Sequence, residues 1–256
     1  MPEITVPLLA LLFVAGLTAG WIDAVVGGGG LVQLPALLLV PGLSPVQAIA
    51  TNKVGSIMGT TVSSITYYRR LHPDLRTALP TAGAALLAAV GGALLASHIP
   101  SAAFRPIILL ACVAVLAWTL FKPSMGEITK LRHSGRRHTA TAVVIGAAIG
   151  LYDGVLGPGT GSFLVIALVA LLGYAFLDAS AIAKIVNLAT NIGALAFFIP
   201  GGHVVWPLGL AMGAGNLIGG YVGARTAVAR GSKFVKVVFV VVVSGLILSL
   251  AWQIVG

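Results

Sequence analysis

Two lysines and two aspartates are the residues best placed to do chemistry, because each lies within a long apolar stretch. Lys53 and Lys184 each fall about eight residues into an expected helix, which is roughly 12 Å along it at 1.5 Å per residue. Asp23 and Asp153 each precede a glycine-rich interruption. Charge inside a bilayer is costly and by default functional. The lysines could attract an anion, and the aspartates could balance that charge or carry a proton.

The glycine-rich interruptions recur about 130 residues apart, as Gly27–Gly30 after Asp23 and as Gly157–Gly161 after Asp153. Each glycine costs about 1 kcal/mol relative to alanine in a helix interior. At membrane depth, irregular backbone is tolerated only where protein or a water-filled cavity satisfies its polar groups. A helix that starts after such a break presents free N–H groups and the positive end of its dipole, both of which favour an anion. The predicted substrate-binding residues of the breaks are Gly28, Gly29, Gly30, Gly159, Thr160 and Gly161.

Polar neighbours accompany both lysines. Thr51 and Asn52 precede Lys53, while Asn187 and Asn191 follow Lys184 at the spacings i+3 and i+7, which share one helix face. We predict that these four residues and the two lysines bind the substrate. Asp23 and Asp153 are predicted to couple its transport to protons. The alternative interpretation is structural: the lysines snorkel or neutralise an aspartate, the aspartates tether the breaks, and the glycines serve close helix packing.

The rest of the chain can hold such a site in a membrane. Of its 256 residues, 58% are hydrophobic and 8% are charged, against roughly 25% charged in a soluble domain. Several apolar runs exceed the roughly 20 residues that span a hydrocarbon core. We therefore predict an all-α polytopic membrane protein. Cys112 is the single cysteine, so no disulfide framework is expected. Met1-Pro2-Glu3 lacks the basic start of a signal peptide, so the first apolar run is expected to be retained.

Local signals predict several helix boundaries. Ser44 followed by Pro45 is typical of a helix start, with a capping hydroxyl and then proline at the first helical position. Asp178 is expected to cap a later helix. Residues 102–121 are expected to span the membrane, and an apolar segment is expected from Thr139 after a basic linker at 122–138.

The chain divides into an N-terminal repeat, residues 1–121, and a C-terminal repeat, residues 139–256. Twelve of the 15 basic residues fall in three clusters, which the positive-inside bias places in the cytoplasm. The clusters are Arg69–Arg76, Lys122–Arg137 and Arg225–Lys236. Equivalent loops of the two repeats differ in charge, so the repeats are predicted to be inverted, each a broken-helix hairpin plus three transmembrane helices. Both termini are then expected outside.

These motifs resemble those of the TauE/SafE sulfite-exporter family. The matching residues are Gly20, Asp23 and the glycines after it, the segment Ala50–Lys53, and weaker copies around Asp153 and Lys184. The resemblance implies a permease of the bacterial plasma (inner) membrane for sulfite or organosulfur anions such as sulfonates. We therefore expect a secondary transporter, an exporter of a small sulfur-containing anion that binds near the bilayer midplane at the repeat interface.

Two other function classes fit parts of the pattern. A divalent-metal transporter would use Asp23 and Asp153 as ligands, but such a site normally draws on His, Cys or clustered carboxylates, and the five histidines lie near predicted helix ends. A membrane-embedded enzyme is less expected, because no buried nucleophile has a histidine partner. We expect no enzymatic activity, no cofactor, no bound metal and no nucleic-acid partner. The partners are the anion and the lipid bilayer, and a homo-oligomer is left open.

Overall fold

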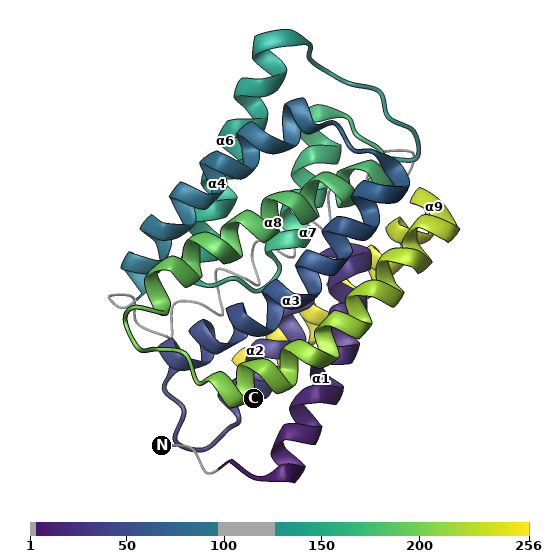
Figure 1. Cartoon of the computed structure of the whole chain (residues 1–256). Helices are drawn as coiled ribbons and strands as arrows, with labels where there is room; N and C mark the ends of the chain where they lie inside the picture. Colours follow the sequence, from purple (N-terminus) through teal and green to yellow (C-terminus); the bar gives the residue numbers. More distant parts are fainter. Residues whose placement is uncertain (1–3, 97–125, 256) are drawn as a thin grey trace.

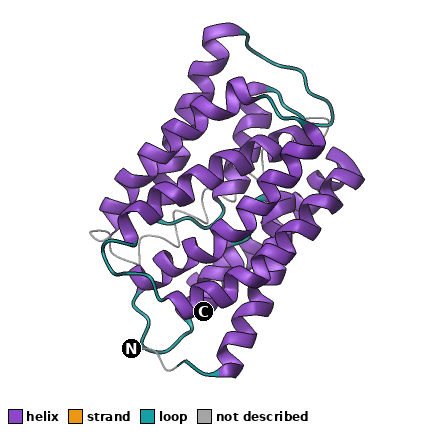
Figure 2. Ribbon diagram, in the orientation of Figure 1, coloured by secondary structure: helices purple, strands orange, loops and turns teal. Residues whose placement is uncertain are grey.

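The computed structural model describes residues 4–96 and 126–255, and these residues form helices and no strand (Figure 2). The predicted span at 102–121 lies outside the described residues. The elements are α1 (Val6–Val26), α2 (Gly30–Leu38), α3 (Pro45–Leu71), α4 (Leu75–Ala96), α6 (Gly135–Val155), α7 (Thr160–Ala167), the π-helix η2 (Leu168–Leu172), α8 (Phe176–Phe198) and α9 (Trp206–Val255).

Capping chemistry explains where α3 begins. The Ser44 hydroxyl accepts from the Gln47 backbone N–H at 3.3 Å, the Gln47 side chain accepts from the Ser44 N–H at 3.0 Å, and Pro45 takes the first helical position. This reciprocal pair is a capping box, and the predicted helix start is confirmed. The prediction that Asp178 caps α8 is wrong. The helix begins two residues earlier, at Phe176, and the Asp178 carboxylate accepts from Thr129 of the linker at 2.5 Å.

The start of α6 also differs from its prediction. The helix begins at Gly135, four residues before the expected Thr139, and so includes the basic end of the linker. A helix tolerates Arg136 and Arg137 well because arginine has high helix propensity. Hydropathy alone therefore placed the start of this helix too late in the sequence. Hydropathy indicates which residues lie in the membrane, and it does not indicate where the helical backbone begins.

Four described helices are long and apolar enough to cross a membrane, namely α1, α4, α6 and α8. The helix α3 has 27 residues, or about 40 Å, but it is more polar because it carries Lys53 and its neighbours. The helices after the breaks are short: α2 has nine residues and α7 has eight before it continues into η2. Neither spans the roughly 30 Å hydrocarbon core alone. The fold is that of a polytopic membrane protein with two broken segments.

The helices pack in two similar groups. Helix α1 lies along α9, and α4 lies along α6; α3 packs on α9, and α8 packs on α4 (Figure 1). Small residues bring the paired backbones together. A Cβ on Gly16 of α1 would overlap the carbonyl of Met212 on α9, and one on Gly150 of α6 would overlap that of Ala85 on α4. Close approach of this kind is the usual means of helix association in lipid.

Connecting segments meet at one end of the molecule. The Lys130 N–H donates to the Gly173 carbonyl at 2.8 Å, and the Leu177 N–H donates to the Ser232 hydroxyl at 3.2 Å. The Tyr174 hydroxyl donates to Asp74 at 3.1 Å. The described parts of all three basic clusters therefore lie at this end. Helix α1 starts, and α9 ends, at the opposite end (Figure 1). Within α9, Gly231 is non-helical with φ 73°, and it marks a kink between two helical stretches.

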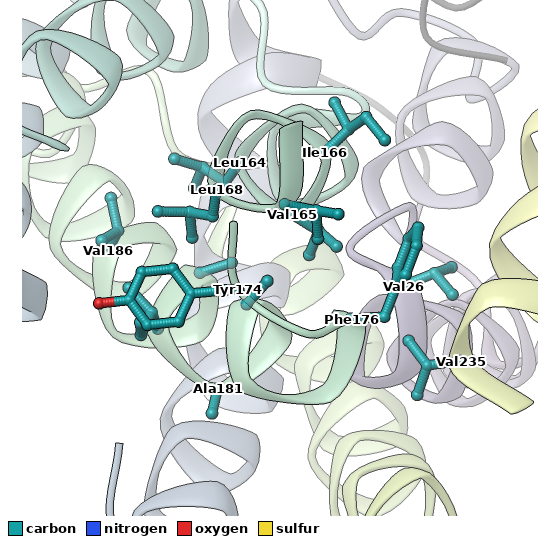
Figure 3. Close-up of a cluster of buried hydrophobic side chains, with 14 of the residues drawn as sticks. Val26, Leu164, Val165, Ile166, Leu168, Tyr174, Phe176, Ala181, Val186 and Val235 are labelled. Atoms are coloured by element: carbon teal, nitrogen blue, oxygen red, sulfur yellow. The ribbon is translucent and has the colours of Figure 1, made fainter. Parts of the chain in front are cut away.

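A buried apolar cluster holds the second broken segment in place. It gathers Val26 of α1, Val165 of α7, Phe176 of α8 and Val235 of α9 (Figure 3). All four are 0% exposed and belong to the same cluster as Leu168, Val169 and Leu172 of η2. This packing fixes the end of α1 against the start of α7, which is where the two glycine breaks meet.

Candidate functional site

The two glycine breaks cross in direct backbone contact. Gly27 ends α1 with φ 80°, and a Cβ on it would overlap the backbone of Gly161 in α7. The Ser162 N–H donates to the Gly27 carbonyl at 3.1 Å, and the Ser162 hydroxyl donates to the Val26 carbonyl at 2.8 Å. Backbone groups that the breaks leave unpaired are therefore partly satisfied across the two halves of the chain.

Two buried ion pairs flank this crossing, and each joins one half of the chain to the other. Lys53 Nζ of α3 lies 2.6 Å from Asp153 Oδ2 of α6. Lys184 Nζ of α8 lies 2.7 Å from Asp23 Oδ2 of α1. The lysines are 1% and 0% exposed. A buried charge without a partner is very costly, so each lysine depends on an aspartate from the other half.

Each aspartate also binds the break of its own half. Asp23 Oδ1 accepts from the Gly29 N–H at 3.3 Å, and Asp153 Oδ1 accepts from the Thr160 hydroxyl at 2.6 Å. The carboxylate therefore connects a lysine on the opposite half with the start of the short helix after the break. Movement of Lys184 would therefore displace Asp23 and the start of α2. Movement of Lys53 would displace Asp153 and the start of α7.

A small closed cavity lies between these groups. Its volume is about 10 Å³, near the minimum that one water requires. It is lined by Asp23, Gly27, Gly30, Asn52, Lys53, Ser56, Asp153, Gly157, Gly161, Asn187 and Asn191. The lining combines ammonium, amide, hydroxyl and carboxylate groups with glycine backbone. A ligand of several heavy atoms fits this volume only if the surrounding helices move apart.

The structure brings most of the predicted site residues to this cavity. Eight of them line it: Asp23, Gly30, Asn52, Lys53, Asp153, Gly161, Asn187 and Asn191. Three more predicted residues do not line the cavity but contact an aspartate that does. Lys184 forms an ion pair with Asp23, the Gly29 N–H donates to Asp23, and the Thr160 hydroxyl donates to Asp153.

The remaining three predicted residues are also not among those lining the cavity. The Thr51 hydroxyl accepts from the Val205 N–H at 3.0 Å and so fastens α3 to the turn before α9. A Cβ on Gly28 would first meet Val242 of α9. Gly159 takes the left-handed conformation at φ 81° as the residue before α7, which favours glycine for conformational reasons.

Sequence reasoning missed one buried polar residue near the site. Gln33 of α2 is 0% exposed, and its Oε1 accepts from Ser56 at 2.8 Å. Its Nε2 has no hydrogen-bond partner among the described residues. The available signal was a single amide within the apolar run Leu31–Val40. Ser56 itself lies at i+3 from Lys53, so it shares the polar face of α3.

Comparisons with known proteins identify the family of this chain. The model of the family described as "Sulfite exporter TauE/SafE" matches residues 12–250. The chain belongs to the TauE/SafE family. Within described residues of this TauE/SafE chain, no three His, Cys, Asp or Glu side chains gather as a metal site would require.

Relatives of this TauE/SafE chain carry general names. A Sinorhizobium sp. protein named "Probable membrane transporter protein ORF9" is 39% identical over 242 residues, which cover 94% of this chain and 92% of that protein. "Probable membrane transporter protein YfcA" of Escherichia coli strain K12 is 34% identical, covering 92% and 86%. A "Probable membrane transporter protein" of Haemophilus influenzae is 33% identical, covering 93% and 92%. No solved structure matches the chain. It is thus a member of a membrane-transporter family.

Proposed function

We propose that this chain is a secondary transporter that exports a small sulfur-containing anion, such as sulfite or an organosulfonate, across the bacterial plasma membrane. The observation that carries the proposal is the pair of buried lysines at the crossing of two broken segments. Discontinuous helices near the midplane form the substrate sites of many secondary transporters. Membership of the TauE/SafE family supports the choice of a sulfur oxyanion.

The chemistry of the cavity favours an anion over a metal cation. Lys53 and the side chains of Asn52, Ser56 and Asn187 all line it, and each offers hydrogen-bond donors. A metal ion would instead need several anionic or imidazole ligands, whereas each of the two carboxylates present is already held 2.6–2.7 Å from a lysine.

Transport through this site requires the ion pairs to exchange partners. The closed cavity is formally neutral, because two lysines face two aspartates. An arriving anion competes with Asp153 for the ammonium group of Lys53. Asp153 must then accept a hydrogen bond from another donor or become protonated. The same reasoning applies to Lys184 and Asp23. Because each aspartate also binds its own break, the exchange is transmitted to α2 and α7 and opens one side of the cavity.

The proposal includes two inverted repeats, residues 1–121 and 139–256, with both termini outside. Helix packing supports it, because exchanging α1 with α6, α3 with α8 and α4 with α9 turns one observed set of contacts into the other. The positive-inside bias places the end that holds the basic clusters in the cytoplasm. The start of α1 and the end of α9 then lie on the opposite side (Figure 1).

The test is transport by the purified full-length chain in proteoliposomes. Sulfite, sulfoacetate, thiosulfate and a divalent metal are offered separately, and solute movement is compared with that in protein-free liposomes. We expect saturable flux of at least one sulfur anion and none of the metal. Metal flux without flux of any anion would contradict the proposal. Turnover of these compounds in detergent, where no compartments exist, would point to an enzyme instead.

A further inference from the structure

A second and much larger cavity lies at the end of the molecule where α4 and α6 begin. Its volume is about 720 Å³, and it shares no lining residue with the small cavity at the glycine breaks. Its walls come from the start of α4, from linker residues 131–134 and from the first turn of α6. Small-molecule sites typically have volumes of about 300–1,000 Å³, so this cavity is large enough for a metabolite or a lipid headgroup.

Three arginines give this cavity a strong positive charge. Arg76 comes from α4, Arg132 from the linker and Arg137 from α6. All three are exposed, and none forms an ion pair with another described residue. A guanidinium group binds phosphate through two parallel hydrogen bonds. Three unpaired groups from three segments can therefore surround a ligand that carries several negative charges.

The one acidic residue in the lining offsets only one of the three positive charges. Asp74 accepts from the Thr77 hydroxyl at 2.6 Å, from the Tyr174 hydroxyl at 3.1 Å and from the Arg76 backbone N–H at 3.0 Å. Burial acts to raise the pKa of this carboxyl, but these hydrogen bonds outweigh it and hold the pKa below its usual value. Burial, in turn, raises the pKa of Tyr174 to about 12, so this residue remains a donor.

His138 closes the inner side of the same cavity. It is 6% exposed, and its Nε2 lies 3.0 Å from the Thr77 hydroxyl and 3.1 Å from that of Tyr174. Thr77 donates its proton to Asp74, and Tyr174 donates to Asp74 or to Thr77, so Nε2 must be the donor to them. The other ring nitrogen, Nδ1, is buried and has no partner among the described residues. With its proton on Nε2, the ring offers no free N–H at Nδ1, so His138 shapes the cavity wall and the arginines supply the donors for an anion.

The start of α6 supplies further donors. Ser134 precedes this 21-residue helix but makes no side-chain capping hydrogen bond. The first N–H groups of α6 therefore keep their capacity to bind an anion, and the helix dipole favours one there. We propose that this cavity binds the phosphate groups of a multiply charged ligand, at an anion site separate from the transport cavity. The phosphates belong either to a soluble phosphorylated metabolite or to an anionic phospholipid headgroup.

Binding of inorganic pyrophosphate to the purified full-length chain tests this proposal without relying on transport. The cavity variant is Arg76→Gln/Arg132→Gln/Arg137→Gln. Its matched control is Arg69→Gln/Arg70→Gln/Arg136→Gln, which removes the same charge from exposed arginines of the same end that do not line the cavity. We expect the cavity variant to raise the Kd by at least about tenfold and the control by less than about twofold. Arg132→Gln alone, in a loop, tests the site should the triple variant fail to fold.

Nanodiscs distinguish the two sources of phosphate. The wild-type chain is placed in phosphatidylcholine alone or in phosphatidylcholine with phosphatidylglycerol. Equal pyrophosphate affinity in both indicates a soluble ligand. Weaker affinity with phosphatidylglycerol, in the wild type and the control but not in Arg132→Gln, indicates a headgroup. Either result supports the site. Equal losses of pyrophosphate affinity in the two triple variants would overturn the proposal, because binding would then depend only on the overall surface charge. Absence of saturable pyrophosphate binding, together with no effect of phosphatidylglycerol, would also overturn it.

Discussion

Lys53 Nζ lies 2.6 Å from Asp153 Oδ2, so a lysine of the N-terminal half is neutralised by an aspartate of the C-terminal half. Lys184 and Asp23 repeat this relationship in the opposite sense at 2.7 Å. Both pairs are buried beside the crossing of the two glycine breaks. The halves therefore cannot separate at this depth without uncovering both pairs, which makes the ion pairs part of the fold as well as of the site.

The first prediction concerns the energy of the Lys53–Asp153 pair. Lys53→Met leaves Asp153 buried without its counter-charge, and we expect a loss of about 3–5 kcal/mol in the free energy of unfolding. Lys53→Met/Asp153→Asn should recover most of that loss, because neither charge remains. Denaturant titration of the wild type, both single variants and the double variant in detergent measures the coupling. Losses that simply add in the double variant would show that the two residues do not act as a pair.

The second prediction concerns the crossing of the breaks. A Cβ on Gly161 would overlap Gly27, whereas one on Gly91 of α4 would meet no atom of the described residues within 4 Å. Gly161→Ala should therefore cost about 1–3 kcal/mol through overpacking, while Gly91→Ala should be neutral or stabilising by about 0.5–1 kcal/mol. Thermal unfolding in detergent compares the two variants. If both melt alike, the breaks do not touch as described.

The third prediction concerns topology. In a Cys112→Ser background, single cysteines replace Arg70, Lys233 and Pro200, all of which are exposed. Inverted repeats require the first two positions to react with a membrane-impermeant thiol reagent only from the cytoplasm, and the third only from outside. Labelling of Arg70→Cys and Pro200→Cys from the same side would remove the basis for inversion.

The fourth prediction concerns coupling to protons. In Asp23→Asn the charge of Lys184 is no longer balanced, so the site can hold an anion without an accompanying proton. We expect Asp23→Asn and Asp153→Asn, singly and together, to weaken the dependence of anion flux on an imposed pH gradient. The measurement is flux in proteoliposomes with and without that gradient. A folded double variant with unchanged dependence would leave the aspartates as structural counter-ions only.

Much of the architecture could be predicted because it follows from local chemistry. Ser44 and Pro45 mark a helix start by their own hydrogen bonding and geometry, and glycine breaks interrupt a helix wherever they occur. The importance of Lys53 and Asp23 followed from the cost of burying any charge. These arguments need no knowledge of which elements are neighbours in space.

The pairing of charges could not be predicted in this way. Asp153 lies 100 residues from its partner Lys53, and only the helix packing decides which lysine it meets. Thr51 and Asn52 are adjacent, yet one binds the turn before α9 and the other lines the cavity. Successive residues point about 100° apart on a helix, so the rotation of α3 about its axis makes that distinction. Gln33 was missed because its partner Ser56 lies on another helix.

If the buried lysines bind the transported anion, sulfite flux must depend on them, and Lys53→Met/Asp153→Asn is the variant in which to measure that flux. This variant removes the charge of one pair without leaving a buried ion unpaired, so it is expected to fold. Lys233→Met removes an exposed lysine and is the matched control. At equal levels of reconstituted protein, we predict that flux falls at least about tenfold in the double variant and is unchanged in the control. Wild-type flux in the folded double variant would show that Lys53 does not bind the transported anion.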